Sequence, residues 1–145
     1  NVFSGKIRNW DDVPGAKQKG TIDLFVRTPA SGTQDAFDKI FMSPLKIFSG
    51  ASQKASNGLV QQSVKSDKAG VGYVSEAFTE GLSVGTYKGV PCTLRSAKSG
   101  QYGGVRNFYF VTRGAANGAA KKWIKWVRSN PAALKIAASE WVPFK

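Results

Sequence analysis

The stretch Arg27-Thr28-Pro29-Ala30-Ser31-Gly32-Thr33 decides the fold of this chain. It follows the apolar run Ile22–Val26, which is rich in β-branched and aromatic residues. It precedes Gln34–Phe41, where apolar residues recur at the i, i+3, i+4 spacing of one helix face, and Pro44 then ends the pattern. We therefore predict a strand, a tight turn of small residues and the start of a helix.

The side chains of this turn suit an oxyanion. The first turn of a helix leaves backbone N–H groups without intrahelical partners, and Gly32 would let a ligand approach them closely. The hydroxyls of Ser31 and Thr33 add donors. Arg27 adds a permanently charged, two-pronged fork for phosphate or carboxylate.

Two other interpretations of the turn stay open. Ser31 and Gln34 fit the Ser-x-x-Gln capping box, in which the two side chains satisfy the helix's own N–H groups. A hydrolase nucleophile at Ser31 is the weaker alternative, because a Gly-x-Ser-x-Gly turn needs glycine where the chain has Pro29 and Thr33. The chain also has no histidine to activate the hydroxyl, so we expect no catalytic residue and no enzyme.

Length and composition indicate one globular domain. The chain has 145 residues, 41% hydrophobic and 21% charged, and no apolar run long enough to span a bilayer. The segment that begins at Asn1 does not read as an export signal, because it opens directly into a folded-looking pattern. With Cys92 as the one cysteine and no histidine, we expect no metal site, no cofactor and no internal disulfide.

The charge balance predicts anionic partners. Lys and Arg number 21 against nine Asp and Glu, which gives a formal net charge of +12. Phosphate, nucleic acid, anionic lipid and an acidic cell wall would all be attracted, so the sign of the charge does not identify the ligand.

Beyond the first helix, the sequence predicts an alternation of strands and helices. The predicted elements are a helical turn at Trp10–Val13, a surface loop over 47–57, a helix capped by Ser56 or Asn57, a glycine-rich strand at Gly70–Val74, two short strands within 80–100, a strand at Arg106–Thr112, a helix at Gly118–Ser129 and a short helix at Pro131–Ala138. This order is typical of an α/β layer fold with a small, partly parallel sheet covered on both sides. Ligands of such sheets bind at the carboxyl ends of strands, where Arg27–Thr33 falls.

The helix predicted over 118–129 has an apolar face and a basic face. The apolar face, predicted to be buried, comprises Ala119, Trp123, Trp126 and Val127. The basic face, predicted to be solvated, comprises Lys121, Lys125 and Arg128. The final segment Trp141–Phe144 must dock on another part of the protein to keep its rings out of water.

Fragments spread over nearly the whole chain share one resemblance. They are Phe3–Trp10, the Arg-x-x-x-Ser-Gly-Thr pattern of residues 27–33, Ser56–Val60, Gly70–Val74, Gly89–Pro91, Tyr102, Arg106–Phe110 and Trp123–Ser129. In their order and spacing, the chain resembles the phosphate-binding proteins of ABC importers, within the class II periplasmic-binding-protein superfamily.

The resemblance implies a three-layer lobe in which a small mixed, partly parallel sheet is flanked by helices. Residues 1–145 would be a single domain, the second lobe of a two-lobe solute-binding protein, with about 113–145 packing back toward the first lobe. The ligand contacts carried over are those of four residues, which would capture phosphate without covalent chemistry. These are Arg27, Ser31, Gly32 and Thr33.

The same resemblance implies partners and a compartment. The partners would be inorganic phosphate, the first lobe of the same receptor and ABC permease subunits, with no nucleic acid. The protein would be extracytoplasmic, either periplasmic or anchored at the cell surface, and this chain would be a piece of an exported precursor. An acid that selects phosphate over sulfate would belong to the first lobe, so we expect weak binding of roughly millimolar strength with little selectivity.

A second function of a different class stays open. A basic nucleic-acid or cell-surface adhesion module would use the basic side chains of the last long helix beside exposed aromatic rings. These side chains are Lys121, Lys122, Lys125 and Arg128.

Overall fold

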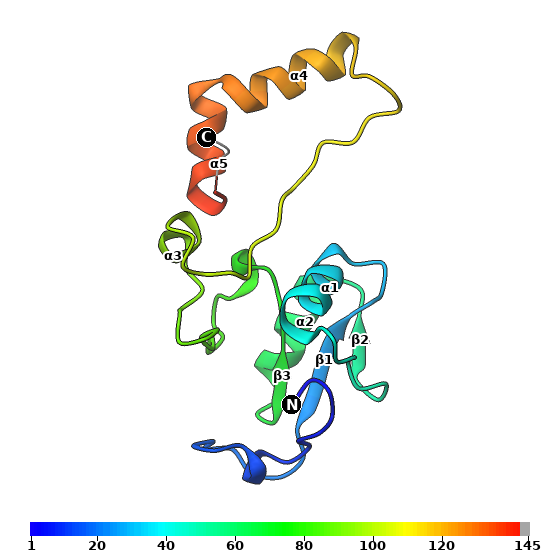
Figure 1. Cartoon of the computed structure of the whole chain (residues 1–145), viewed down its shortest axis with the longest axis vertical. Coiled ribbons are helices and arrows are strands. Elements are labelled where there is room, and N and C mark those ends of the chain that lie inside the picture. The colour runs from blue at the N-terminus through cyan, green and yellow to red at the C-terminus, as the bar shows by residue number, and fades with distance from the viewer. Residues whose placement is uncertain (143–145) are drawn as a thin grey trace.

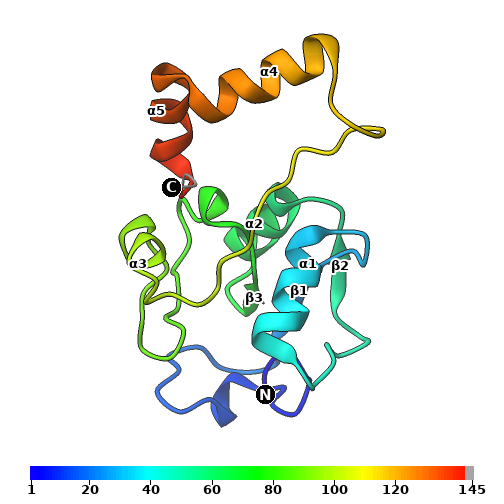
Figure 2. The same cartoon turned by 45° about the horizontal axis from the view of Figure 1, so that its top comes forward.

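The computed structural model describes residues 1–142, which form a small sheet with helices around it and two C-terminal helices beyond (Figures 1 and 2). The elements in chain order are η1 (Trp10–Asp12), β1 (Asp23–Arg27), α1 (Gly32–Phe37), η2 (Asp38–Met42), β2 (Ser52–Lys54), α2 (Asn57–Ser66), β3 (Gly70–Gly72), η3 (Glu76–Phe78), α3 (Leu94–Lys98), α4 (Gly118–Ser129) and α5 (Pro131–Glu140). The predicted α/β class is confirmed.

The sheet is parallel and has the strand order β2-β1-β3. The central strand β1 begins one residue later than predicted and pairs through Phe25 with Ser52 on one side and Gly72 on the other. The prediction of a loop over 47–57 was wrong, because the edge strand β2 lies within it. A strand of three polar residues at a sheet edge carries no apolar alternation for sequence reasoning to detect.

The core covers both faces of the sheet. Ile22, just before β1, and Leu24 and Val26 of β1 are buried on one face, whereas Val60 of α2, which is 0% exposed, lies on the other face against Gly72. Gly72 explains the glycine-rich strand, because a Cβ at this position would lie 2.7 Å from Val60 Cγ1 and 2.8 Å from the Phe25 carbonyl oxygen. The absence of a side chain therefore allows α2 to approach β1 and β3 closely.

Aromatic rings tie the first helix to the end of β3. The helix predicted at Gln34–Phe41 is present, but it begins two residues earlier as α1 and continues as the π-helix η2. The rings of Phe37 and Tyr73 stack with centroids 3.8 Å apart, and Phe3 meets Phe37 edge-on at 4.8 Å. This contact fixes α1 against the strand end that follows β3.

The part of the chain after β3 departs from the predicted strands. The two strands expected within 80–100 are replaced by an isolated bridge between Tyr87 and Val90 and by the short helix α3. The strand expected at Arg106–Thr112 is an extended segment without regular secondary structure. Its residues have strand-forming side chains, but among residues 1–142 no neighbouring strand supplies the hydrogen bonds that a strand requires.

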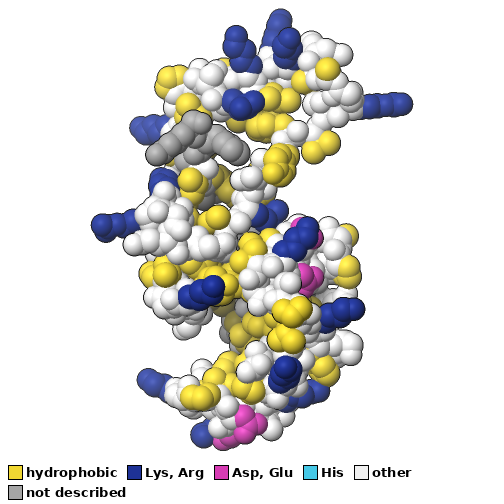
Figure 3. Space-filling model, viewed as in Figure 1, with side chains coloured by type: hydrophobic (Ala, Val, Ile, Leu, Met, Phe, Trp, Pro, Cys, Tyr) yellow, Lys and Arg dark blue, Asp and Glu magenta, His cyan; other side chains and the backbone are white. Residues whose placement is uncertain are grey.

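The helix α4 has the predicted bounds, but its apolar face is not buried. Trp123 is 55% exposed and Trp126 is 48% exposed, and no described residue of α4 is buried. Figure 1 shows the reason: α4 stands away from the sheet at the end of the extended segment and packs on α5. In Figure 3, hydrophobic side chains lie open along this helix beside Lys and Arg side chains, which confirms that its basic face is solvated.

The final segment makes a ring contact as predicted, but its tryptophan, Trp141, stays 40% exposed. Trp141 meets Phe108 edge-on, with centroids 4.4 Å apart. Pro143 and Phe144, for which docking was also predicted, lie outside the described residues. The C-terminal helix α5 is present where a short helix was predicted, and Asn130 caps its first turn.

Candidate functional site

The predicted turn lies at the carboxyl edge of the parallel sheet. Arg27 ends β1, Ser31 caps α1, and Gly32 and Thr33 form the first residues of that helix. Ser75 follows the end of β3 at the same edge. The order of strand, turn and helix therefore brings hydroxyl, guanidinium and backbone N–H groups to the same edge of the sheet.

The cationic side chain of Arg27 also forms hydrogen bonds that connect β1 to β2 and α2. Its Nε donates to the Lys54 carbonyl at 3.3 Å, Nη1 donates to Asn57 Oδ1 at 2.9 Å, and Nη2 donates to the Ala55 carbonyl at 2.9 Å. These bonds join the end of β1 to the end of β2 and the start of α2. A guanidinium has five N–H groups, so two remain for a ligand.

Ser31 is a true helix cap, but the full capping box is absent. Its buried Oγ accepts hydrogen bonds from the backbone N–H groups of Thr33 at 3.1 Å and Gln34 at 3.3 Å. The Gln34 side chain does not complete the box, because its Nε2 donates to both carboxylate oxygens of Asp38 at 3.0 Å. The hydroxyl proton of Ser31 is still available for an anion, since the cap uses only its oxygen.

Two polar residues that sequence reasoning missed complete the edge. The Nδ2 group of Asn57 donates to Ser75 Oγ at 3.2 Å, and this oxygen lies 3.4 Å from Thr33 Oγ1. Hydrogen bonds therefore run from Arg27 through Asn57 and Ser75 to Thr33. The position of Ser75 shortly after β3 was the available signal, because ligands favour the carboxyl ends of parallel strands.

Tyr73 forms hydrogen bonds to residues on both sides of the turn. The Tyr73 hydroxyl accepts a hydrogen bond from the backbone N–H of Arg27 at 3.1 Å and donates to Gln34 Oε1. Burial raises the pKa of Tyr73 to about 12, the backbone N–H of Arg27 lowers it, and the Asp38 carboxylate adds to the increase. At neutral pH the hydroxyl keeps its proton, so it can donate to Gln34 while it accepts from the backbone N–H at the end of β1.

A second guanidinium lies on the turn. A Cβ placed on Gly32 would lie 2.8 Å from Nη1 of Arg106, so this side chain rests directly against the glycine. Sequence reasoning did not assign Arg106 to the site, because it lies 74 positions after Gly32 in the chain, in a segment predicted to be a strand.

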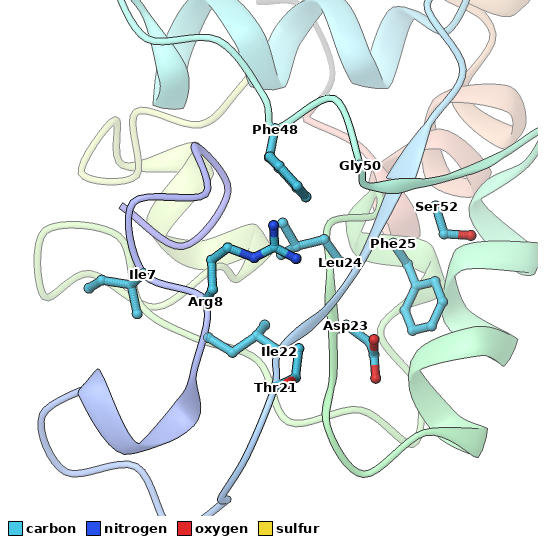
Figure 4. Close-up of a pocket in the computed structure, with 10 residues that line it drawn as sticks. All are labelled: Ile7, Arg8, Thr21, Ile22, Asp23, Leu24, Phe25, Phe48, Gly50 and Ser52. Carbon is cyan, nitrogen blue, oxygen red and sulfur yellow. The ribbon is translucent and has the colours of Figure 1, made fainter.

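Two cavities lie beside the sheet, and neither encloses the turn. The cavity in Figure 4, of about 120 Å³, lies along the first half of β1 and has the Arg8 guanidinium 4.1 Å from the Phe48 ring centroid. The other, of about 270 Å³, reaches Arg27 but not Ser31 or Thr33. At the turn itself, Gly32 is exposed to solvent, whereas Ser31 is buried.

Two structural features are absent from residues 1–142. Among these residues, no group of three or more His, Cys, Asp and Glu side chains is arranged to hold a metal ion. None of the helices described in this range is long and apolar enough to cross a membrane.

Comparisons with known proteins agree with this architecture. The phosphate-binding protein PstS of Bacillus subtilis is 25% identical over 96% of the chain, and PstS 2 of Streptococcus agalactiae is 27% identical over 88% of it. The chain spans about half the length of these relatives, 46% and 47% respectively.

Solved structures share the fold at lower identity. A putative phosphate ABC transporter substrate-binding protein from Clostridium perfringens, with bound phosphate, superposes with a TM-score of 0.79 at 19% identity, over 99% of this chain and 60% of that one. An ABC-type phosphate transport receptor from Vibrio cholerae gives a TM-score of 0.74 at 20% identity, over 98% and 60%. The family model of the PBP superfamily domain matches residues 1–131. The chain therefore belongs to the PBP superfamily.

Proposed function

We propose that this chain is a phosphate-binding lobe of an ABC-importer receptor, with the ligand held by Arg27, Ser31, Gly32 and Thr33. The observation that carries the proposal is the convergence of a guanidinium, two hydroxyls and an exposed glycine at the carboxyl edge of β1. The names of the relatives, which are phosphate-binding proteins, support the choice of anion.

Binding at this turn is non-covalent. The two free N–H groups of Arg27 supply charge-assisted hydrogen bonds, and the Ser31 and Thr33 hydroxyls supply neutral ones. No step breaks a bond in the ligand, and the chain has no histidine to make Ser31 a nucleophile. The protein therefore acts as a carrier and not as an enzyme.

The open site and the exposed C-terminal aromatics fit one lobe of a two-lobe receptor. A first lobe would close over the anion and exclude water, and it would also cover the apolar face of α4 that carries Trp123 and Trp126. In this proposal, residues from about 113 onward contact the first lobe, the receptor acts outside the cytoplasm, and it delivers phosphate to a permease. The alternative of a nucleic-acid or adhesion module is not favoured, because the relatives bind phosphate by name.

A phosphate titration followed by backbone NMR tests the proposal. Inorganic phosphate should shift the amide signals of residues 27–34, with a Kd of roughly millimolar order for an open site. Sulfate at matched ionic strength should give similar shifts. Arg27→Ala should weaken binding about tenfold or more, because a charge-assisted hydrogen bond contributes about 1.5–3 kcal/mol.

Lys125→Ala is the matched control for the loss of one positive charge, since Lys125 is exposed on α4 and distant in sequence from the turn. It should leave phosphate binding unchanged. Shifts that follow α4 instead of residues 27–34 would contradict the proposed site.

A further inference from the structure

Arg106 is held over the turn by two contacts. Its Nη1 atom would lie 2.8 Å from a Cβ placed on Gly32, so only the absence of a side chain there lets the guanidinium sit against the backbone. On the other side, Arg106 Cζ lies 4.7 Å from the centroid of the Phe108 ring. A guanidinium stacked on an aromatic face keeps its N–H groups directed outward in its own plane, where a ligand can reach them.

The side-chain N–H groups of Arg106 have no partner among residues 1–142. Within residues 1–142, the ion pairs are Lys19–Asp11 and Lys39–Asp35, and no hydrogen bond of the Arg106 side chain to another group is found. Arg27 differs, because three of its five N–H groups are bonded to β2 and α2. The cation with the greater capacity for a new ligand is therefore Arg106.

We propose that Arg106 is a second anion-binding guanidinium of this site and favours tetrahedral oxyanions that carry two negative charges. The inference rests on the proposed function and assigns separate roles to the two arginines. Arg27 fixes the geometry of the turn and contributes two N–H groups, whereas Arg106 closes on the anion from the extended segment. Two cations on one anion interact more strongly with a divalent than with a monovalent ion, because Coulomb energy scales with the product of the charges.

The test compares Arg106→Ala with Arg113→Ala. Both arginines are exposed and lie between α3 and α4, and replacing either one removes one positive charge, but Arg113 lies seven residues farther along the chain. With inorganic phosphate at constant ionic strength, Arg106→Ala should raise Kd roughly tenfold or more, whereas Arg113→Ala should change it less than about twofold. Arg106→Lys should recover part of the loss, since an ammonium keeps the charge but not the fork.

A second readout separates ligand contact from a structural role. Sulfate and perchlorate are both tetrahedral, with two charges and one charge respectively, so Arg106→Ala should weaken sulfate binding more than perchlorate binding. A variant that merely disturbed the turn would weaken both equally, and that result would overturn the inference. The Arg106 side-chain N–H signal should also shift when phosphate is added to the parent protein.

The two proposals fail in different ways. If Arg106→Ala binds phosphate like the parent while Arg27→Ala does not, the role of Arg106 is overturned and the proposed function stands. If the parent shows no phosphate-dependent shift at residues 27–34 or at Arg106, both are overturned.

Discussion

Arg27 connects three elements through one side chain, and this makes it important for stability as well as for binding. Its guanidinium bonds the end of β1 to Lys54 and Ala55 at the end of β2 and to Asn57 at the start of α2. These bonds indicate that, without Arg27, the fold persists with a lower free energy of unfolding.

We expect Arg27→Ala to lower the free energy of unfolding by about 1–3 kcal/mol, because two partly buried acceptors and one exposed acceptor lose a charged donor. Urea denaturation followed by circular dichroism measures this. Lys39→Ala is the control, since its ion pair with Asp35 is exposed and should contribute less than about 1 kcal/mol. Equal urea midpoints for the parent and Arg27→Ala would show that the hydrogen bonds of Arg27 do not stabilise the fold.

Gly72 and Gly85 differ in the space available for a side chain. A Cβ at Gly72 would meet Val60 Cγ1 at 2.7 Å and the Phe25 carbonyl oxygen at 2.8 Å, whereas a Cβ at Gly85 would meet nothing within 4 Å. Gly72→Ala should therefore destabilise the protein by about 1–3 kcal/mol through overpacking, and Gly85→Ala should be nearly neutral. Thermal unfolding of the two variants would decide, and similar melting temperatures would contradict the close packing of β3 on α2.

Tyr73 predicts a loss of stability in alkaline solution. The folded state raises the pKa of its hydroxyl from 10.0 to about 12, chiefly by burial, so the folded protein holds this proton more tightly than the unfolded chain. Its contribution to stability is complete below pH 10 and is lost as the pH rises to about 12. The pKa of Tyr102 is also raised to about 12, again by burial first, and it acts in the same direction.

Chemical denaturation of the parent and of Tyr73→Phe between pH 8 and pH 12 tests the prediction, since phenylalanine cannot ionise. The variant should lose less stability than the parent in the range between the two pKa values of Tyr73, 10.0 and about 12. Parallel pH profiles would mean that Tyr73 titrates alike in the folded and unfolded states.

At the level of single residues, the sequence identified the part of the candidate site that lies within one local motif and missed the residues that come from elsewhere. Ser31, Gly32 and Thr33 follow one another in the chain, so the turn alone identifies them. Asn57, Ser75 and Arg106 reach the same edge only after the strands pair and the extended segment crosses the turn. No spacing rule along the sequence encodes that approach.

For helices and strands, the sequence likewise predicted what depends on neighbouring residues and missed what depends on contacts with distant parts of the chain. The bounds of α4 follow from its own apolar and basic periodicity, and they were predicted correctly. The burial of its apolar face was predicted wrongly, because periodicity shows which residues share a face and not what that face packs against. Arg106–Thr112 was predicted to be a strand for a related reason: its side chains favour a strand, but no pairing partner is found among residues 1–142.

This correction changes the expected effect of Trp123→Ala. A buried tryptophan would cost about 3–5 kcal/mol on truncation, but Trp123 is 55% exposed and meets Phe110 edge-on with centroids 5.3 Å apart. We now expect a cost of about 1 kcal/mol, the value of a partly exposed aromatic pair. Val60→Ala, at the fully buried position, should cost roughly 2–3 kcal/mol. The prediction fails if urea denaturation ranks the two variants in the opposite order.

For the whole molecule, the four tryptophans differ in their access to solvent. The Trp10 indole is half-buried and donates from Nε1 to the Ala69 carbonyl at 2.9 Å, whereas Trp123 and Trp126 lie open on α4. Acrylamide should therefore quench the emission of Trp123 and Trp126 more strongly than that of Trp10 in variants that retain one tryptophan each. In a longer receptor that includes a first lobe, quenching of the α4 tryptophans should fall. Unchanged quenching there would contradict the proposed contact between α4 and that lobe.

The segment between α3 and α4 connects the proposed anion site to the two C-terminal helices. Arg106 lies on this segment, and the helices α4 and α5 follow it without interruption (Figure 1). An anion that holds Arg106 against Gly32 thereby restricts the positions open to both helices. By thermodynamic reciprocity, whatever fixes α4 and α5 in that position increases the affinity for the anion by the same factor. The effect of the anion on the contacts of α4 and α5, and the effect of those contacts on anion affinity, would then report the same coupling free energy.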